Sequence, residues 1–311
     1  MTAPAIPAAG ARRLPRGGVR PRAERWGGLV EAAFRGHAVA VYAFLYLPIV
    51  IVVLFAFNAT DRRVTLWEGF SPKWFSVALG DKVVQKTLIN SFIVALPNAI
   101  LATVFGTMAA LGLQRVPKPV RLVFDSLTYV SVIVPEIVIA LSTLVMFATS
   151  FDLLQSLFGI KLGFGHPTII AAHVLFNTSL VLLLVRARLT TMDRTLVEAS
   201  YDLFAPPWRT FRQITFPQLL PSIVAGFLLS FTFSFDDYVI TTFTSGPGST
   251  TLPLFIFGQV KRGVTPETNA VATMMLAFTL AMLVAGQLLL RWQGRTRGSP
   301  TSMAGMIATE R

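Results

Sequence analysis

The chain has 311 residues, of which 53% are hydrophobic and only 14% are charged, and its formal net charge is +12. Soluble domains usually contain about one quarter charged residues, so this composition excludes an ordinary soluble domain and favours a membrane protein. The chain contains no cysteine, which excludes disulfides and thiolate metal sites. Its three histidines show no ligand spacing and indicate no metal site.

Six long apolar blocks follow one another along the chain. Each is close to or above the roughly 20 residues that a helix needs to cross about 30 Å of hydrocarbon. Backbone groups in lipid must pair internally, so blocks of this length are helices rather than barrel strands. The blocks cover 38–57, 88–113, 126–149, 167–185, 218–244 and 268–290. The sequence therefore predicts an all-α membrane domain of six transmembrane helices over 38–292, between a basic N-terminal tail, 1–37, and a C-terminal tail, 293–311.

The basic residues are unevenly divided between the two sides of this predicted domain. Alternate connections, counted with both tails, hold nineteen lysines and arginines on one side and eight on the other. The positive-inside rule places the richer side, and with it both termini, in the cytoplasm. The net charge is thus a signal of topology. We expect the arginine-rich tail to face lipid headgroups, and we expect no nucleic-acid partner.

The longest cytoplasmic connection, 186–217, has the sequence pattern of two short helices. Thr195 and Glu198 have the spacing of a capping box, which starts a helix. Pro206 and Pro207 end that helix, and Pro207 suits the first turn of a second one. We expect the second helix to cover 208–214 and to end before Pro217.

The first of these two short helices carries two acids on one face. Glu198 and Asp202 are four residues apart. A short amphipathic helix at a membrane surface either lies on lipid or docks against a partner protein. Because the inner leaflet is negative, the two acids favour a partner protein.

The same segment resembles a known motif. EASYDLFA at 198–205, followed by FPQLLP at 216–221, resembles the EAA loop of binding-protein-dependent ABC importer permeases. The resemblance implies that 188–221 forms coupling helices, between membrane helices 4 and 5, that sit in a cleft of an ATPase subunit. The implied coupling residues are Glu198, Ala199, Asp202, Leu203, Phe204, Ala205 and Pro217. The chain departs from the motif at Phe204, where the family usually has glycine.

The resemblance continues beyond the loop. SFDDYVITTFTSGPGSTTLP at 234–253 and VKRGVTPETNAVAT at 260–273 are similar to the second permease subunit of spermidine/putrescine-type importers. This implies a type I ABC importer permease fold in a bacterial inner membrane, and a polyamine as the solute. It also implies four partners: a second homologous permease subunit, two cytoplasmic ATP-binding subunits, and a periplasmic or extracytoplasmic solute-binding protein.

Three carboxylates lie within the predicted membrane blocks. Asp236 and Asp237 are in the fifth block and Glu136 is in the third. Such residues usually face a bundle interior or an aqueous path, so we assign these three and Tyr238 to the substrate path. Neighbouring residues on a helix point about 100° apart, so we expect one aspartate to line the path and the other to pair with a neighbour. Alternatively, the pair caps a broken helix or binds a basic side chain. His173 and Asn177 are expected to form hydrogen bonds between helices.

Motifs for catalysis and for nucleotide binding are missing from the sequence. No G-x-x-x-x-G-K-[ST] phosphate loop occurs, so ATP hydrolysis is expected in a partner chain. We also find no nucleophile–base set and no metal-ligand set, and we expect neither enzymatic activity nor a cofactor. Two alternatives stay open. One is an importer permease for another small amine or a phosphonate, and the other is an ATP-independent secondary transporter.

Overall fold

The computed structural model describes residues 23–61 and 66–296, with side chains for 30–61 and 66–288. Most of both predicted tails, including the arginine-rich arm, lies outside the described residues. The chain divides into two compact units, Met1–Ile51 and Val52–Arg311. The first unit, where described, consists of most of helix α1, Ala23–Phe55, and the second contains all the other helices.

Six helices among the described residues are long and apolar enough to cross a membrane. They cover Val30–Phe55, Lys82–Gly112, Glu136–Phe158, His166–Thr191, Pro207–Phe235 and Pro266–Leu288. Each overlaps one of the six predicted blocks. The described chain contains no strand beyond one isolated bridge, between Asn58 and Phe70, so the predicted all-α class is confirmed.

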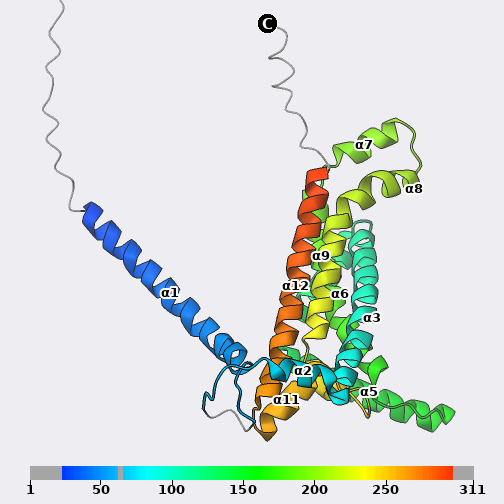
Figure 1. The fold of residues 1–311 in the computed structure, drawn as a ribbon. Helices are drawn as coiled ribbons and strands as arrows, with labels where there is room; N and C mark the ends of the chain where they lie inside the picture. Colours follow the sequence, from blue (N-terminus) through cyan, green and yellow to red (C-terminus); the bar gives the residue numbers. More distant parts are fainter. Residues whose placement is uncertain (1–22, 62–65, 297–311) are drawn as a thin grey trace, which may run out of the picture. The chain divides into compact units, whose positions relative to one another are not determined.

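The core of the second unit is formed by α3 (Lys82–Gly112), α6 (His166–Thr191) and α9 (Phe216–Phe235), which Figure 1 shows running side by side with α12 (Pro266–Thr296). Small residues allow the first two to approach closely. A Cβ atom added at Gly106 of α3 would lie 2.7 Å from Cβ of Val181 on α6. Lipid provides little hydrophobic drive between helices, so close packing of this kind stabilises the bundle.

Buried amides also join these three helices. Asn98 on α3 donates to the carbonyl oxygen of Ser230 on α9 over 3.0 Å. Asn177 on α6 donates to the side-chain oxygen of Asn98 over 3.3 Å. The predicted role of Asn177 as a hydrogen-bonding residue between helices is therefore confirmed.

The third predicted block is not one helix. The chain breaks at Val134 and Pro135, between α4 (Lys118–Ile133) and α5 (Glu136–Phe158). Proline disfavours a helical residue before it, and Val134 is accordingly extended, with ψ of 133°. The predicted helix over 126–149 is therefore wrong, and Glu136 lies at the first residue of a membrane helix.

The fifth predicted block is broken as well. Helix α9 ends at Phe235, the three residues 236–238 are not helical, and α10 (Val239–Thr244) follows. A further helix, α11 (Leu252–Arg262), precedes α12. The expected continuous helix over 218–244 is thus wrong, and the alternative of a broken helix at the aspartate pair is what the structure contains.

The predicted pair of short helices is present, with two differences. Helix α7 (Thr195–Asp202) and α8 (Pro207–Thr210) are separated at Pro206, and Pro207 occupies the first turn of α8. The expected capping box is wrong. The first amide of α7, that of Thr195, donates instead to the Asp193 carboxylate over 2.9 Å.

The second difference concerns the end of the second short helix. It was expected to end before Pro217, but it continues through a π-helix, η1 (Phe211–Thr215), directly into α9. A π-turn is wider than an α-turn, and Pro217 has no backbone N–H to donate. The second short helix of the coupling segment 188–221 and the fifth membrane helix therefore form one uninterrupted helical run, Pro207–Phe235.

Candidate functional site

Asp237 stabilises the helix break from inside the bundle. Its side chain is only 5% exposed. One carboxylate oxygen accepts from the backbone N–H and from the hydroxyl of Thr241, each over 2.7 Å. The other accepts more weakly from the backbone N–H of Ile240, over 3.4 Å. Asp237 thus satisfies two of the backbone amides in the first turn of α10, those of Ile240 and Thr241, which have no partner within that helix.

His173 on α6 completes this network. Its Nε2 lies 3.1 Å from the Asp237 carboxylate, and its Nδ1 lies 2.7 Å from the Ser234 hydroxyl. A neutral ring with its proton on Nε2 satisfies both contacts, donating to the carboxylate and accepting from the hydroxyl. The predicted hydrogen bonds of His173 between helices are therefore confirmed, and they fix the end of α9 and the start of α10 against α6.

Asp236 has a different environment from its neighbour. It is exposed, and among the described residues its carboxylate forms no hydrogen bond or ion pair. It lines two cavities, one of about 410 Å³ and one of about 360 Å³. Of the two adjacent aspartates, Asp236 is therefore the one whose carboxylate is available to a ligand.

The smaller cavity brings together all the residues predicted for the substrate path. Glu136, Asp236, Asp237 and Tyr238 line it, although Glu136 comes from α5, about 100 residues earlier in the chain. Glu136 is exposed at the start of its helix. Three carboxylates around one cavity produce a negative potential that favours a cation over an anion.

The larger cavity is mostly apolar. Tyr238 and residues of α11 and α12 surround it, and Asp236 is the one charged residue among those that line it in the described chain. The rings of Tyr238 and Phe257 lie against each other there, with centroids 4.1 Å apart and planes tilted by 36°. No pattern in the sequence singled out Phe257, because it is one of two phenylalanines in the apolar first half of α11, LPLFIFGQVKR, and reaches the cavity only through the tertiary fold.

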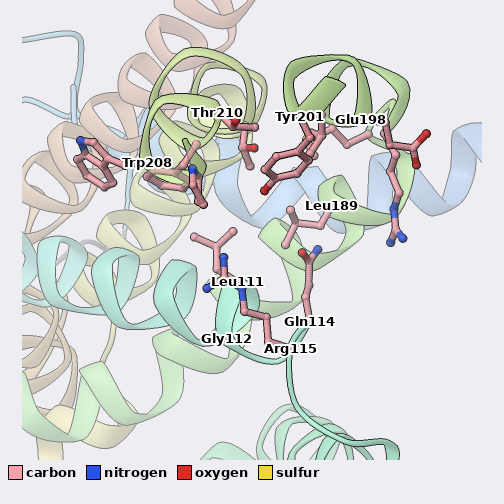
Figure 2. Close-up of a pocket in the computed structure, with 15 residues that line it drawn as sticks. Leu111, Gly112, Gln114, Arg115, Leu189, Glu198, Tyr201, Trp208 and Thr210 are labelled. Carbon is pink, nitrogen blue, oxygen red and sulfur yellow. The ribbon is translucent and has the colours of Figure 1, made fainter. Parts of the chain in front are cut away.

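A second candidate region lies at the opposite end of α9, on the coupling segment. A cavity of about 620 Å³ lies between α7, α8 and the end of α3. Figure 2 shows the side chains that line it, among them Glu198, Tyr201 and Trp208. A hydrogen bond of 2.8 Å between the hydroxyls of Ser200 and Thr210 ties the two short helices together. Tyr201 on α7 and Trp208 on α8 were not predicted as site residues, because a single aromatic residue in a short helix has no distinctive spacing.

The turn between α7 and α8 is a Schellman motif centred on Phe204. The N–H of Phe204 donates to the carbonyl of Tyr201 over 2.9 Å, and that of Ala205 donates to the carbonyl of Ser200 over 3.0 Å. This motif requires a left-handed residue, and Phe204 has φ of +55°. Glycine adopts that conformation without strain, which explains why the resembled motif has glycine at this position.

The tip of this turn exposes apolar side chains. Leu203 is 81% exposed and Phe204 is 94% exposed. Of the other predicted coupling residues, Glu198, Ala199 and Asp202 are exposed on α7, whereas Ala205 and Pro217 are half-buried. The structure thus brings the acidic and apolar members of the set onto one short element and leaves Pro217 apart from them, at the start of α9.

Known proteins resemble this chain in sequence and in fold. The family described as "Binding-protein-dependent transport system inner membrane component" matches residues 88–297. The spermidine/putrescine transport system permease protein PotC of Escherichia coli strain K12 is 35% identical over 264 residues, which are 85% of this chain and 95% of PotC. The putrescine transport system permease protein PotI of the same strain is 37% identical over 236 residues, which are 76% of this chain and 82% of PotI.

The fold comparison agrees with the sequence comparisons. A bacterial ABC transporter involved in the import of the acidic polysaccharide alginate has a chain that superposes with a TM-score of 0.72, covering 86% of this chain and 96% of its own length. At 13% identity this likeness concerns the fold alone. Both the family match and the two relatives cover most of the six-helix domain. This chain therefore belongs to the family of inner membrane components of binding-protein-dependent transport systems.

Proposed function

We propose that this chain is the permease subunit of an ATP-driven ABC importer that carries polyamines such as spermidine and putrescine across a bacterial inner membrane. The names of PotC and PotI support a polyamine solute. The structural support is the difference between Asp236 and Asp237. The carboxylate of Asp236 is free to contact a solute, whereas that of Asp237 stabilises the broken helix.

The substrate path runs along Asp236, Glu136 and Tyr238. The first two are exposed carboxylates, and all three residues line the same cavity. A polyamine carries two or more ammonium groups, and it loses hydration as it crosses the low-dielectric bundle. Carboxylates on the path offset that loss through charge attraction, which water screens less effectively there. Asp237 acts on the solute only indirectly, because its oxygens are occupied by His173 and by α10.

The coupling residues contact an ATPase partner. Leu203 and Phe204 form an exposed apolar tip beside the acids of α7, and exposed apolar groups with a polar rim are typical of protein–protein contact sites. In this proposal two cytoplasmic ATP-binding subunits hydrolyse ATP, a second related permease chain completes the path, and a solute-binding protein delivers the polyamine. Both termini are cytoplasmic, on the side richer in lysine and arginine.

The test is uptake of radiolabelled putrescine and spermidine into proteoliposomes that contain the whole complex, with the ATPase rate measured alongside. We expect Asp236→Asn to reduce uptake by at least tenfold while the complex still assembles and still responds to loaded binding protein. Glu198→Ala should reduce uptake and stimulated ATPase activity together. Asp152→Asn, an exposed acid on α5 away from both cavities, is the matched control and should behave as wild type.

Two results would overturn the proposal at different levels. Unchanged uptake in Asp236→Asn removes that residue from the path. A wild-type complex that transports neither polyamine, yet hydrolyses ATP in response to a binding protein loaded with another solute, keeps the permease role and rejects the polyamine.

A further inference from the structure

An alkylammonium group of the protein itself lies on the ring of Phe257, one of the residues that line the larger cavity. The Nζ atom of Lys261 lies over the ring of Phe257, 4.9 Å from its centroid. Both residues are on α11, four positions apart, so they share a helix face. Among the described residues, Lys261 forms no ion pair with an acid. Its ammonium is therefore paired with an aromatic ring and not with a carboxylate.

The Phe257 ring also belongs to the wall of the cavity. It is 39% exposed, lies against the tilted ring of Tyr238, and lines the same cavity as Asp236. The negative face of a ring attracts an ammonium ion, and a nearby carboxylate adds to that attraction. The remaining wall is made largely of apolar side chains such as Ile256, Met275 and Leu276. An apolar chain with a primary ammonium at its end fits this combination of surfaces.

We propose that Phe257 and Lys261 form an exchange site for the amine solute, in which a terminal ammonium of the solute takes the place of the Lys261 ammonium on the Phe257 ring. This inference rests on the proposed function and adds two residues to it. Lysine and a polyamine end in the same chemical group, a primary ammonium on a methylene chain, so the ring accepts either. Phe257 stabilises the bound solute, and Lys261 competes with it.

The exchange also explains how the solute can be released. A site made only of carboxylate and aromatic groups binds a polycation tightly, and release of the solute then limits the rate of transport. A tethered ammonium at high local concentration displaces the solute without being carried away itself. Lys261 therefore lowers the affinity for the solute and raises its rate of departure.

The two residues predict affinity changes of opposite sign. Substituting Phe257→Leu keeps an apolar side chain and removes the ring, so it should raise Kd for putrescine about three- to tenfold, the range expected of one ammonium–ring contact. Substituting Lys261→Gln removes the competitor and should lower Kd about two- to fivefold, because the Phe257 ring is then open to the solute. A change that merely loosened α11 would raise Kd in both variants.

The experiment is equilibrium binding of radiolabelled putrescine to the permease–ATPase complex, trapped with ATP and vanadate and measured without solute-binding protein, so that Kd reports the permease. Controls are Phe278→Leu, an aromatic of matching 38% exposure on α12, and Arg262→Gln, the cation next to Lys261. Both should keep the wild-type Kd, and Lys261→Arg should resemble wild type because it retains a cation for the ring.

Three outcomes overturn the exchange site: Kd unchanged in Phe257→Leu, Kd raised in Lys261→Gln, or no putrescine retained by the trapped wild type. None of these outcomes contradicts the proposed function, which fails only if the intact system with its binding protein does not take up polyamine. Opposite shifts of Kd in Phe257→Leu and Lys261→Gln, with an unchanged Kd in the controls, establish the exchange site.

Discussion

The chain interrupts a helix at two places that differ in how the break is stabilised. At 236–238 the break lies inside the bundle, and side chains satisfy the freed backbone groups, above all Asp237 with His173 behind it. At 203–206 the break lies at the exposed tip of the coupling segment, and backbone hydrogen bonds of the Schellman motif suffice. A break inside the bundle needs dedicated polar side chains for its buried backbone groups, whereas a break at the exposed surface tolerates even a strained residue. Substitutions at the two breaks should therefore have very different effects on stability.

The largest loss of stability is expected from Asp237→Ala. It leaves the amides of Ile240 and Thr241 and the His173 ring without their acceptor in a buried site, which costs about 3 kcal/mol. The measurement is the thermal unfolding midpoint of the purified chain in detergent, together with the yield of folded protein. Asp236→Ala is the matched control, since the same deletion one residue earlier removes an exposed carboxylate. Equal losses in the two variants would contradict the assignment of the structural role to Asp237.

A smaller loss is expected where α3 and α6 touch. Gly106→Ala places a methyl group 2.7 Å from Cβ of Val181 and 2.9 Å from the carbonyl oxygen of Thr178. The helices must separate slightly, which costs about 1–3 kcal/mol and lowers the unfolding midpoint. Gly112→Ala, at the end of the same helix and with no atom within 4 Å of the added methyl group, should leave the midpoint unchanged. A midpoint for Gly106→Ala that equals the wild-type value would show that the two helices are not in this contact.

At the exposed break we expect a gain in stability. Phe204→Gly relieves a left-handed conformation that costs a residue with a side chain roughly 1 kcal/mol. The same change deletes the most exposed apolar side chain of the proposed ATPase contact. Unfolding measurements should therefore show a slightly more stable chain, while stimulated ATPase activity of the full complex should fall. Leu203→Ala, the control, should weaken the coupling without the gain. Should Phe204→Gly stabilise the chain and leave the ATPase rate intact, the ring has no role in the contact.

The smallest effect concerns the start of α7. Hydrogen bonds from the hydroxyl and the N–H of Thr195 hold the pKa of Asp193 below its ordinary value of 3.8. Because the folded pKa is the lower one, this contribution to stability is complete above pH 3.8 and is lost as the pH falls through the folded pKa. Hydrogen exchange of the first α7 amides, corrected for intrinsic rates, should show protection that declines below about pH 4. In Asp193→Asn the decline should disappear, since the amide oxygen still accepts and does not titrate.

The sequence predicted the number of membrane helices well and their interruptions poorly. The apolar blocks are long enough to be recognised as membrane helices, but the hydropathy of a block does not change where the helix within it is interrupted at one or two residues. Pro135 signals one of the breaks in retrospect, since the residue before a proline avoids the helical region. The coupling break was predictable because Pro206 and Pro207 lie together in a polar segment.

The candidate site was predictable in its residues and not in its geometry. Isolated carboxylates in apolar blocks pointed to Glu136, Asp236 and Asp237. That Asp237 pairs with His173, 64 residues earlier, depends on how α6 packs against the broken helix, and no local pattern encodes it. The same holds for Phe257, whose meeting with Tyr238 and Asp236 is produced only by the fold.

The uninterrupted helical run from Pro207 to Phe235 has a mechanical consequence. At 1.5 Å per residue its 29 residues span about 43 Å, from Pro207, just after the exposed turn of the proposed ATPase contact, to the residue before Asp236. A displacement of the first turn of such a helix is transmitted to its far end, because no loop interrupts the run between the two ends. Two places along this run lack the regular α-helical hydrogen bonds, the π-helical stretch Phe211–Thr215 and the turn before Pro221 inside α9, so we expect any bending of the run to occur there.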